Sequence, residues 1–426
     1  MKTTLEAMMH LLIYASVLLG LVLMTSPGDA AESDVRDKWA HHGFHIERTN
    51  IAMLTPEEFP IIPWGWTAGD DKALKEIKDC GFNLAGFVAP QHVKMVEKAG
   101  LKCIVDDPRI SSAVPDGNLP DAEVTKRVEE SVKPFRDNPA VYGYYMKDEP
   151  TVDWYPNLAR WRSTLAKVEP DAVAYINLLP IGAQGPGVEN YEQYLERFAT
   201  EVKPVYISYD HYTVLDDGSM RPSFFQNLEV VRKTAQRHGI PFWNIILSNA
   251  HFRYAKPTQG TMNIQVFGTL AYGVRGLSYF TYFAPLIGNY RDAPIDQFMN
   301  KTPTWDMIRI LNQQIHMLGP TYTRLRSVNV FHNQDVPQGC SGMDTSRHLA
   351  EVSGGNFLVG EFIHEDGRPF VMVVNKDIHT SAAFSVKFKK EGRVMLTNAY
   401  TGQTVPWQGE NNWLAPGQGM MLSLER

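Results

Sequence analysis

The chain carries the stretch Ala140-Val-Tyr-Gly-Tyr-Tyr-Met-Lys-Asp-Glu-Pro150, a strand-like run that ends in two adjacent carboxylates, Asp148 and Glu149. Pro150 lacks a backbone N–H, so it ends the strand directly after them. In a (β/α)8 barrel, a carboxylate at the end of a strand faces the mouth of the barrel, where such proteins carry their chemistry. The stretch therefore predicts a functional acid if the surrounding sequence builds a barrel.

Strand-like and helix-like segments alternate eight times around this stretch. The first strand is predicted over Phe59–Trp66, the fourth over Val141–Asp148, and the last helix over Thr304–Leu318. Strict alternation with short turns is typical of a parallel sheet wrapped by helices. A doubly wound open sheet is the alternative, but the sequence shows neither a reversal of strand order nor a glycine-rich phosphate turn. We therefore expect an α/β fold, with a (β/α)8 TIM barrel over residues 40–322.

The pattern changes after Gly319-Pro320. Residues 327–426 lack a helical period and consist of short β runs separated by turns such as Glu365-Asp366-Gly367 and Tyr400-Thr401-Gly402. Short strands with regular turn signals predict a small antiparallel β-sandwich domain.

Residues 1–31 have the composition of a secretory signal peptide. Lys2 supplies a positive start, Leu11–Met24 is almost wholly apolar, and small residues follow at 26–31. The apolar run is too short to span a membrane comfortably, and no cysteine follows it to accept a lipid. We expect a secreted or periplasmic protein with no membrane attachment once the signal is removed.

The composition of the chain limits the classes of ligand that we expect the protein to bind. The chain has 426 residues, is 44% hydrophobic and has a net charge of -6, which gives no reason to expect nucleic acid binding. Cys80, Cys103 and Cys340 are too few for a disulfide framework, and the first two lie in apolar settings that predict buried free thiols. No C-x-x-C or H-E-x-x-H spacing occurs, so no metal or other cofactor is expected. The oligomeric state is left open.

Strand periodicity assigns some acids to the barrel interior. Side chains alternate along a strand, so the apolar Val205, Ile207 and Tyr209 place Ser208 and Asp210 on the inward face. In the fourth strand, parity does not decide which of Asp148 and Glu149 points inward, because the strand ends there.

Two carboxylates across a sugar-sized cleft are the minimum for cleaving a glycosidic bond: one donates a proton, and the other attacks or activates water. Glu149 is the candidate acid, since burial and the neighbouring Asp148 raise a carboxyl pKa. Asp148 and Asp210 are the candidates for the second role. The competing interpretation is structural: Asp148 caps the following helix, and Glu149 pairs with Lys147 or an arginine.

Further residues at strand ends are candidates for binding a substrate through hydroxyl recognition or ring stacking. Asp106 and Asp107, in contrast, are expected to cap a helix or pair with Arg109. The substrate-binding candidates are Trp64, Trp66, Asn177, His211, Tyr212, Asn249, His251 and Tyr282.

These motifs carry a resemblance to a known group. Over most of residues 55–320 the chain resembles the glycoside hydrolases of clan A, including the beta-galactosidase-like families. Those enzymes place Asn-Glu-Pro at the end of strand four with the Glu as acid/base, and the matching residues here are Asp148-Glu149-Pro150. Residues 327–426, with Phe370–Asn375 and Trp413–Gly419, look like the C-terminal module of such enzymes. The resemblance implies a carbohydrate substrate.

The sequence departs from clan A at strand seven. The family carries its nucleophilic Glu there, but Trp243-Asn-Ile-Ile-Leu-Ser-Asn-Ala-His251 contains no acid. Two alternatives remain. In the first, the Asp148-Glu149 pair is similar to that of substrate-assisted N-acetylhexosaminidases, and Tyr209-Asp210 is similar to the strand-six Tyr-Asp of family 18 chitinases. In the second, Asp210 acts as the base of an inverting reaction.

The sequence therefore predicts a secreted glycoside hydrolase with Glu149 as general acid. The first alternative is a non-catalytic carbohydrate-binding protein on a hydrolase fold. A lyase acting on acidic sugars is a third possibility, but the strand ends offer few basic residues beyond Lys147 and Arg109.

Overall fold

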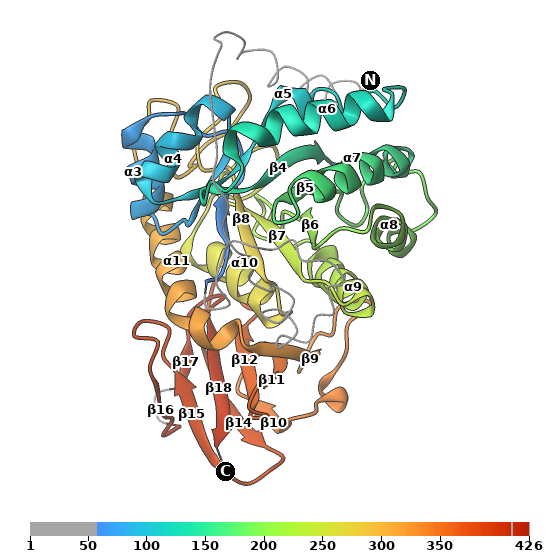
Figure 1. Cartoon of the computed structure of the whole chain (residues 1–426). Helices are drawn as coiled ribbons and strands as arrows, with labels where there is room; N and C mark the ends of the chain where they lie inside the picture. The colour runs from blue at the N-terminus through green and yellow to red at the C-terminus, as the bar shows by residue number, and fades with distance from the viewer. Residues whose placement is uncertain (1–57, 410–411, 426) are drawn as a thin grey trace.

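The computed structural model describes residues 58–409 and 412–425, so the predicted signal peptide lies outside the described residues. In this part of the chain, eight parallel strands form one nearly closed barrel in the order β1-β8-β7-β6-β5-β4-β3-β2 (Figure 1). The predicted barrel is confirmed. Its strands are β1 Ile61–Pro63, β2 Leu84–Val88, β3 Lys102–Val105, β4 Val141–Asp148, β5 Val173–Leu178, β6 Ile207–Asp210, β7 Phe242–Leu247 and β8 Gly276–Phe280.

Backbone hydrogen bonds beyond β1 complete the barrel between β1 and β2. Thr67 N–H donates to the Phe87 carbonyl, and Phe87 N–H donates to the Gly65 carbonyl, each over 2.9 Å. Gly86, beside Phe87, has φ 88° and would place a Cβ only 2.7 Å from the Pro63 carbonyl oxygen. Only glycine combines this backbone conformation with so close an approach.

Helices cover the outside of the barrel (Figure 1). No helix in the described part of the chain is both long and apolar enough to cross a membrane. The helices are α3 Asp71–Asp79, α4 Val93–Ala99, α5 Pro108–Ser111, α6 Asp121–Val132, α7 Tyr155–Val168, α8 Tyr191–Arg197, α9 Ser223–His238, α10 Gln259–Ala271 and α11 Pro303–Tyr322.

The last barrel helix extends further than the sequence predicts. The expected end was Leu318, before Gly319-Pro320, but α11 continues to Tyr322 with Pro320 inside its last turn. Tyr322 explains the extension, because its hydroxyl donates to the carbonyls of Leu270 and Val274 over 2.7 and 3.2 Å. Tertiary contacts thus outweigh the cost of a proline near a helix end.

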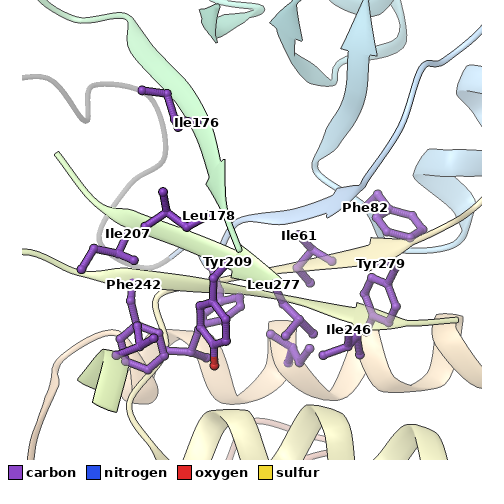
Figure 2. Close-up of a cluster of buried hydrophobic side chains, with 14 of the residues drawn as sticks. Ile61, Phe82, Ile176, Leu178, Ile207, Tyr209, Phe242, Ile246, Leu277 and Tyr279 are labelled. Carbon is purple, nitrogen blue, oxygen red and sulfur yellow. The ribbon is translucent and has the colours of Figure 1, made fainter. Parts of the chain in front are cut away.

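Alternating side chains divide the barrel into an inner and an outer core. Figure 2 shows part of the outer layer, where Ile207 and Tyr209 of β6 contribute to the apolar cluster between strands and helices. Ser208 lies on the opposite face, where its hydroxyl contacts Tyr175, a member of the inner cluster. The predicted parity of β6 is therefore confirmed, and Asp210 lies on the inward face.

Antiparallel sheets follow the barrel, as predicted (Figure 1). The larger sheet has the order β16-β15-β18-β12-β11-β9, and two short pairs, β10–β14 and β13–β17, pack over its far face around a second apolar core. The strands are β9 Leu325–His332, β10 Leu349–Ser353, β11 Phe357–His364, β12 Pro369–Asn375, β13 Ala382–Ala383, β14 Ser385–Phe388, β15 Arg393–Thr397, β16 Thr404–Pro406, β17 Trp413–Leu414 and β18 Gly419–Glu425.

Helix α10 joins the barrel to the larger sheet. Its residues 260–271 are all buried, because β7 covers one side and strands β11, β12 and β18 cover the other. Small residues permit this close packing: a Cβ on Gly360 of β11 would lie 2.0 Å from the Ala271 carbonyl oxygen. Asn263 also donates to the Pro416 carbonyl over 2.9 Å, which fixes the helix against the sheet.

Replacing Gly360 by alanine should destabilise the protein through this junction. The added methyl group overpacks the contact between β11 and α10, so we expect the free energy of unfolding to fall by about 1–3 kcal/mol. Urea denaturation of the full chain measures the change. Gly117→Ala is the matched control, since its Cβ would meet nothing within 4 Å. Equal effects of the two substitutions would contradict the close packing of α10.

Candidate active site

A cavity of about 500 Å³ opens at the carboxyl ends of the barrel strands. It brings together all three predicted catalytic acids and most of the predicted substrate-binding residues, although they come from six different segments of the chain. The predicted residues that line it are Trp64, Trp66, Asp148, Glu149, Asn177, Asp210, Tyr212, His251 and Tyr282.

Two backbone irregularities aim both acids of β4 into the cavity. The register between β4 and β5 shifts after Tyr145, so that Asp148 lies opposite Asn177. Glu149 then adopts a left-handed conformation with φ 47°, and its N–H donates to the Asn177 carbonyl over 2.9 Å. A residue other than glycine is strained in this region of φ, and such strain is found preferentially at functional sites. The sequence does not decide which of Asp148 and Glu149 points inward. In the structure both line the cavity, because a bulge in the strand is followed by a turn at Glu149.

A single amide holds the acids of β4 and β6 together. The Asn177 Nδ2 group donates to Asp148 Oδ1 and to Asp210 Oδ1, each over 3.0 Å. The Asn177 Oδ1 atom accepts a hydrogen bond from Ser208 over 3.1 Å, which fixes the orientation of the amide. A neutral donor, the Asn177 amide, therefore holds Asp148 and Asp210 near each other.

Glu149 keeps its proton at neutral pH. Burial raises its pKa to about 9, with further contributions from the negative charges of Asp210 and Asp148. Burial and the charge of Asp148 also raise the pKa of Asp210, to about 7. The two carboxyl groups influence each other directly, and this interaction raises the pKa of Glu149 and lowers that of Asp210. The two groups therefore titrate as a pair in which Glu149 is the one that favours its proton.

The structural interpretation of the two β4 acids does not hold. Thr151 and Trp154, not Asp148, occupy the N-cap positions of the next helical segments, η3 (Val152–Trp154) and α7. The Lys147 ammonium group lies 4.9 Å from the centre of the Trp154 ring, and its charge is the smallest influence on the pKa of Glu149.

The prediction for Asp107 is confirmed. Its carboxylate caps α5 by accepting from the N–H of Arg109, and it also binds the guanidinium group of Arg109 over 2.7 Å. Asp106 instead accepts a hydrogen bond from the indole N–H of Trp66. This bond fixes the Trp66 ring at the cavity wall.

The two tryptophans differ in their access to a ligand. Trp66 is 39% exposed, lines the cavity and rests edge-on against Phe87 and Tyr145. Trp64 is buried and packs against Phe87 and Phe280. Trp66 is therefore the better platform for a sugar ring.

His251 presents a hydrogen-bond acceptor to the cavity. Asn249 donates through Nδ2 to the Phe280 carbonyl over 3.0 Å, so its Oδ1 atom faces His251 Nδ1 at 2.8 Å and accepts a hydrogen bond from it. Burial, assisted by the charge of Arg291, lowers the pKa of His251 to about 4. The ring is therefore neutral, and its Nε2 atom carries a lone pair. Asn249 itself lies behind the cavity wall and orients His251.

His211 lies outside the cavity. Its side chain follows the strand alternation and points away from the interior, toward α9, where Nε2 is 2.9 Å from the Ser223 hydroxyl and the ring packs against Phe224. Burial lowers its pKa to about 3, so it is a neutral packing residue.

Sequence reasoning missed part of the cavity wall. Arg221, Tyr254, Phe280, Leu286 and Tyr290 line the cavity, and the Arg221 guanidinium group donates to the Tyr254 hydroxyl over 3.3 Å. A signal was present, because residues 281–302 separate β8 from α11, and long connections at the mouth of a barrel are usually functional.

The described residues offer no group of three His, Cys, Asp or Glu side chains that could hold a metal ion. All three cysteines are free, and Cys80 and Cys103 are buried, as predicted. The cavity presents carboxylates, the His251 imidazole, the Arg221 guanidinium group and aromatic rings.

Similar folds occur among solved structures. No protein-family model and no curated protein matches this chain. A protein described as a glycoside hydrolase has a TM-score of 0.56 at 11% identity and covers 91% of this chain and 98% of its own. A glycoside hydrolase family 5 protein from Bacteroides vulgatus has a TM-score of 0.56 at 12% identity, with coverage of 91% and 95%.

A third structure, the beta-galactosidase from the psychrophilic Marinomonas ef1, has a TM-score of 0.47 at 9% identity. The match covers 61% of this chain and spans 60% of that one. At these identities the similarity concerns the fold alone. The resemblance to glycoside hydrolases is thus confirmed at the level of the fold.

The protonation of Glu149 should appear in the pH dependence of stability. The unfolded chain ionises this group near 4.5, whereas the folded chain keeps the proton to about 9, so ionisation favours the unfolded state between these values. Relative to Glu149→Gln, the wild type should lose about 1–3 kcal/mol of stability between pH 5 and pH 8. Urea denaturation of both proteins at several pH values measures this. A constant difference between them would show that Glu149 titrates normally.

Proposed function

We propose that this protein is a glycoside hydrolase in which Glu149 protonates the glycosidic oxygen. The observation that carries the proposal is the position of Glu149, beside Asp148 and Asp210 and with a raised pKa, inside a cavity lined by aromatic rings. A general acid must hold its proton at the working pH and release it when the leaving oxygen gains charge, which requires a raised pKa. The cavity of about 500 Å³ is large enough for a sugar ring.

Asp210 is a poor candidate for the second catalytic role. In an inverting reaction the two carboxyl groups are separated by about 6.5–9.5 Å, so that a water molecule and the sugar fit between them. Asp210 and Glu149 instead influence each other's pKa values directly, as neighbouring carboxyl groups do. The negative charge of Asp210 raises the pKa of Glu149, and we assign this role to Asp210.

Substrate assistance is the mechanism that fits the remaining groups. Ser248 and Asn249, at the end of β7, place no carboxylate where a double-displacement nucleophile would be needed. Asp148 lines the cavity beside Glu149 and is held by the Asn177 amide. We propose that Asp148 accepts a hydrogen bond from the N–H of a 2-acetamido group on the sugar.

The proposed reaction has two balanced steps. The acetamido oxygen bonds to the anomeric carbon, the bond to the glycosidic oxygen breaks, and the proton of Glu149 passes to that oxygen, which leaves as an alcohol. A water oxygen then bonds to the same carbon, the cyclic intermediate opens, and the Glu149 carboxylate takes the proton from water. The Asp148 carboxylate stabilises the positive charge of the intermediate, and the anomeric configuration is retained.

The Glu149→Gln substitution should abolish hydrolysis without loss of folding. Glutamine keeps the shape of the side chain but cannot donate the proton, so kcat/KM for glycosides with poor leaving groups should fall at least about 1,000-fold. Hydrolysis of a panel of aryl glycosides and polysaccharides measures the effect. Full activity of the variant would show that another group is the acid.

The same panel tests the second candidate function, a non-catalytic carbohydrate-binding protein. Two observations favour that candidate: the direct contact of Glu149 with Asp210 and the absence of a carboxylate at the end of β7 in the described chain. If the wild type cleaves nothing in the panel but binds oligosaccharides, this second function replaces the first.

Substrate assistance makes a separate prediction about the sugar. Aryl glycosides of N-acetylglucosamine or N-acetylgalactosamine should be cleaved at least about 100-fold faster than the matched 2-hydroxy glycosides, because only the former contain the nucleophile. Asp148→Asn should reduce kcat at least about 10-fold and leave KM within a factor of about three, since Asp148 stabilises mainly the charged intermediate. Equal rates on both sugar types would refute the assisted mechanism and leave the role of Glu149 as acid standing.

We also place this activity outside the cytoplasm. The support for this part of the proposal is the predicted signal peptide over residues 1–31, whose apolar run is followed by small residues.

A further inference from the structure

Five large apolar side chains are exposed beside the cavity, and we refer to them as the apolar rim. Leu286 and Phe298 are 82% and 84% exposed, and Ile287 is 57% exposed. Phe252 and Met299 are exposed as well. All of them except Phe252 belong to the segment between β8 and α11. Clustered exposed apolar side chains mark binding surfaces more often than isolated ones do.

The fold holds the rim in its exposed position. Asp296 Oδ1 accepts hydrogen bonds from the N–H groups of Phe298 and Asn300 over 2.9 and 2.8 Å, which fixes a tight turn. Met299 has φ 63° in the same turn and donates through its N–H to the Asp296 carbonyl. The turn therefore presents Phe298 and Met299 to solvent by its own geometry.

The rim is continuous with the cavity. Leu286 and Phe252 belong to both, because they also line the cavity that contains Glu149. The side chain of Gln297 donates to the carbonyls of Pro285 and Tyr290 over 3.4 and 2.7 Å, which ties the turn of Phe298 to the cavity wall. A ligand that extends beyond the cavity on this side meets the rim.

Three of the five rim side chains differ in their chemistry from the sugar platform. Sugar rings are bound by flat aromatic faces, such as that of Trp66, and by hydrogen-bonding groups. Leu286, Ile287 and Met299 offer neither a flat face nor a polar atom suited to hydroxyl groups. They gain free energy only by covering another apolar surface.

We propose that the apolar rim binds an apolar aglycone, so that the substrate is an amphiphilic glycoside with an alkyl or lipid chain as leaving group. This inference rests on the proposed function, in which the sugar lies over Glu149 inside the cavity. The leaving oxygen then faces outward, and the group attached to it extends over Leu286 toward Ile287 and Phe298.

Binding of non-hydrolysable glycosides tests the inference independently of catalysis. The probes are methyl and octyl 1-thio-β-glycosides of glucose, galactose and N-acetylglucosamine, titrated calorimetrically into the full chain below their micelle concentrations. For the sugar that binds best, the octyl compound should bind at least about 30-fold more tightly than the methyl compound, since its added methylenes are partly buried.

The variant Ile287→Ser/Phe298→Ser removes two rim side chains that do not line the cavity. It should reduce the ratio of octyl to methyl affinity to less than about threefold. Tyr400→Ser is the matched control, because Tyr400 is 68% exposed on the turn between β15 and β16, and it should keep the wild-type ratio.

Two results would overturn the inference: equal binding of the methyl and octyl compounds by the wild type, or an octyl preference that survives in the double variant. Self-association is the competing use of the rim. A wild-type dimer in sedimentation experiments that dissociates in the double variant, without any octyl preference, would assign the rim to a second copy. Failure of the proposed function would give a different result. In that case the protein would cleave no glycoside but would still bind the octyl compound more tightly than the methyl compound.

Discussion

The structure of the site depends on one constraint: three carboxylates from two strands share a buried region without a metal-binding cluster in the described chain to offset their charge. The repulsion is relieved in two ways. Asn177 donates hydrogen bonds to Asp148 and Asp210, and Glu149 retains its proton because its pKa is raised. Neighbouring carboxylates in a partly buried site raise one another's pKa values, and here the largest rise falls on Glu149, the residue best placed to act as an acid.

The barrel supports this arrangement through its strands. The register shift in β4 and the left-handed conformation of Glu149 turn two consecutive residues toward the same cavity, which ordinary strand alternation forbids. The Tyr194 hydroxyl donates to the Pro150 carbonyl over 2.6 Å and so anchors the turn to α8. Such strain and buried charge reduce stability, a cost that functional sites commonly carry.

Much of this organisation could be predicted from the sequence, because it depends on periodicity. The alternation of segments predicts the barrel, and the apolar positions of β6 predict that Asp210 faces inward. The orientation of Glu149 could not be predicted, since it depends on a bulge whose register is set by pairing with β5. The hydrogen bonds of Asn177 to the two aspartates, and the part of the cavity wall formed by residues 281–302, could not be predicted either. Both depend on contacts between segments that are distant in the sequence. His211 and His251 both lie at strand ends, so the sequence does not show which of them lines the cavity. The structure does, because His211 packs against α9 and His251 is oriented by Asn249.

The central claim is that Glu149 is protonated at neutral pH beside Asp148 and Asp210. Infrared difference spectroscopy of the wild type against Glu149→Gln at pH 7 tests it most directly, because a protonated carboxyl group has a carbonyl stretch separate from the bands of a carboxylate. The account predicts that the wild type shows this carbonyl band and that the variant lacks it. A wild type with only carboxylate bands, or a protonated band that survives in the variant, would contradict the account.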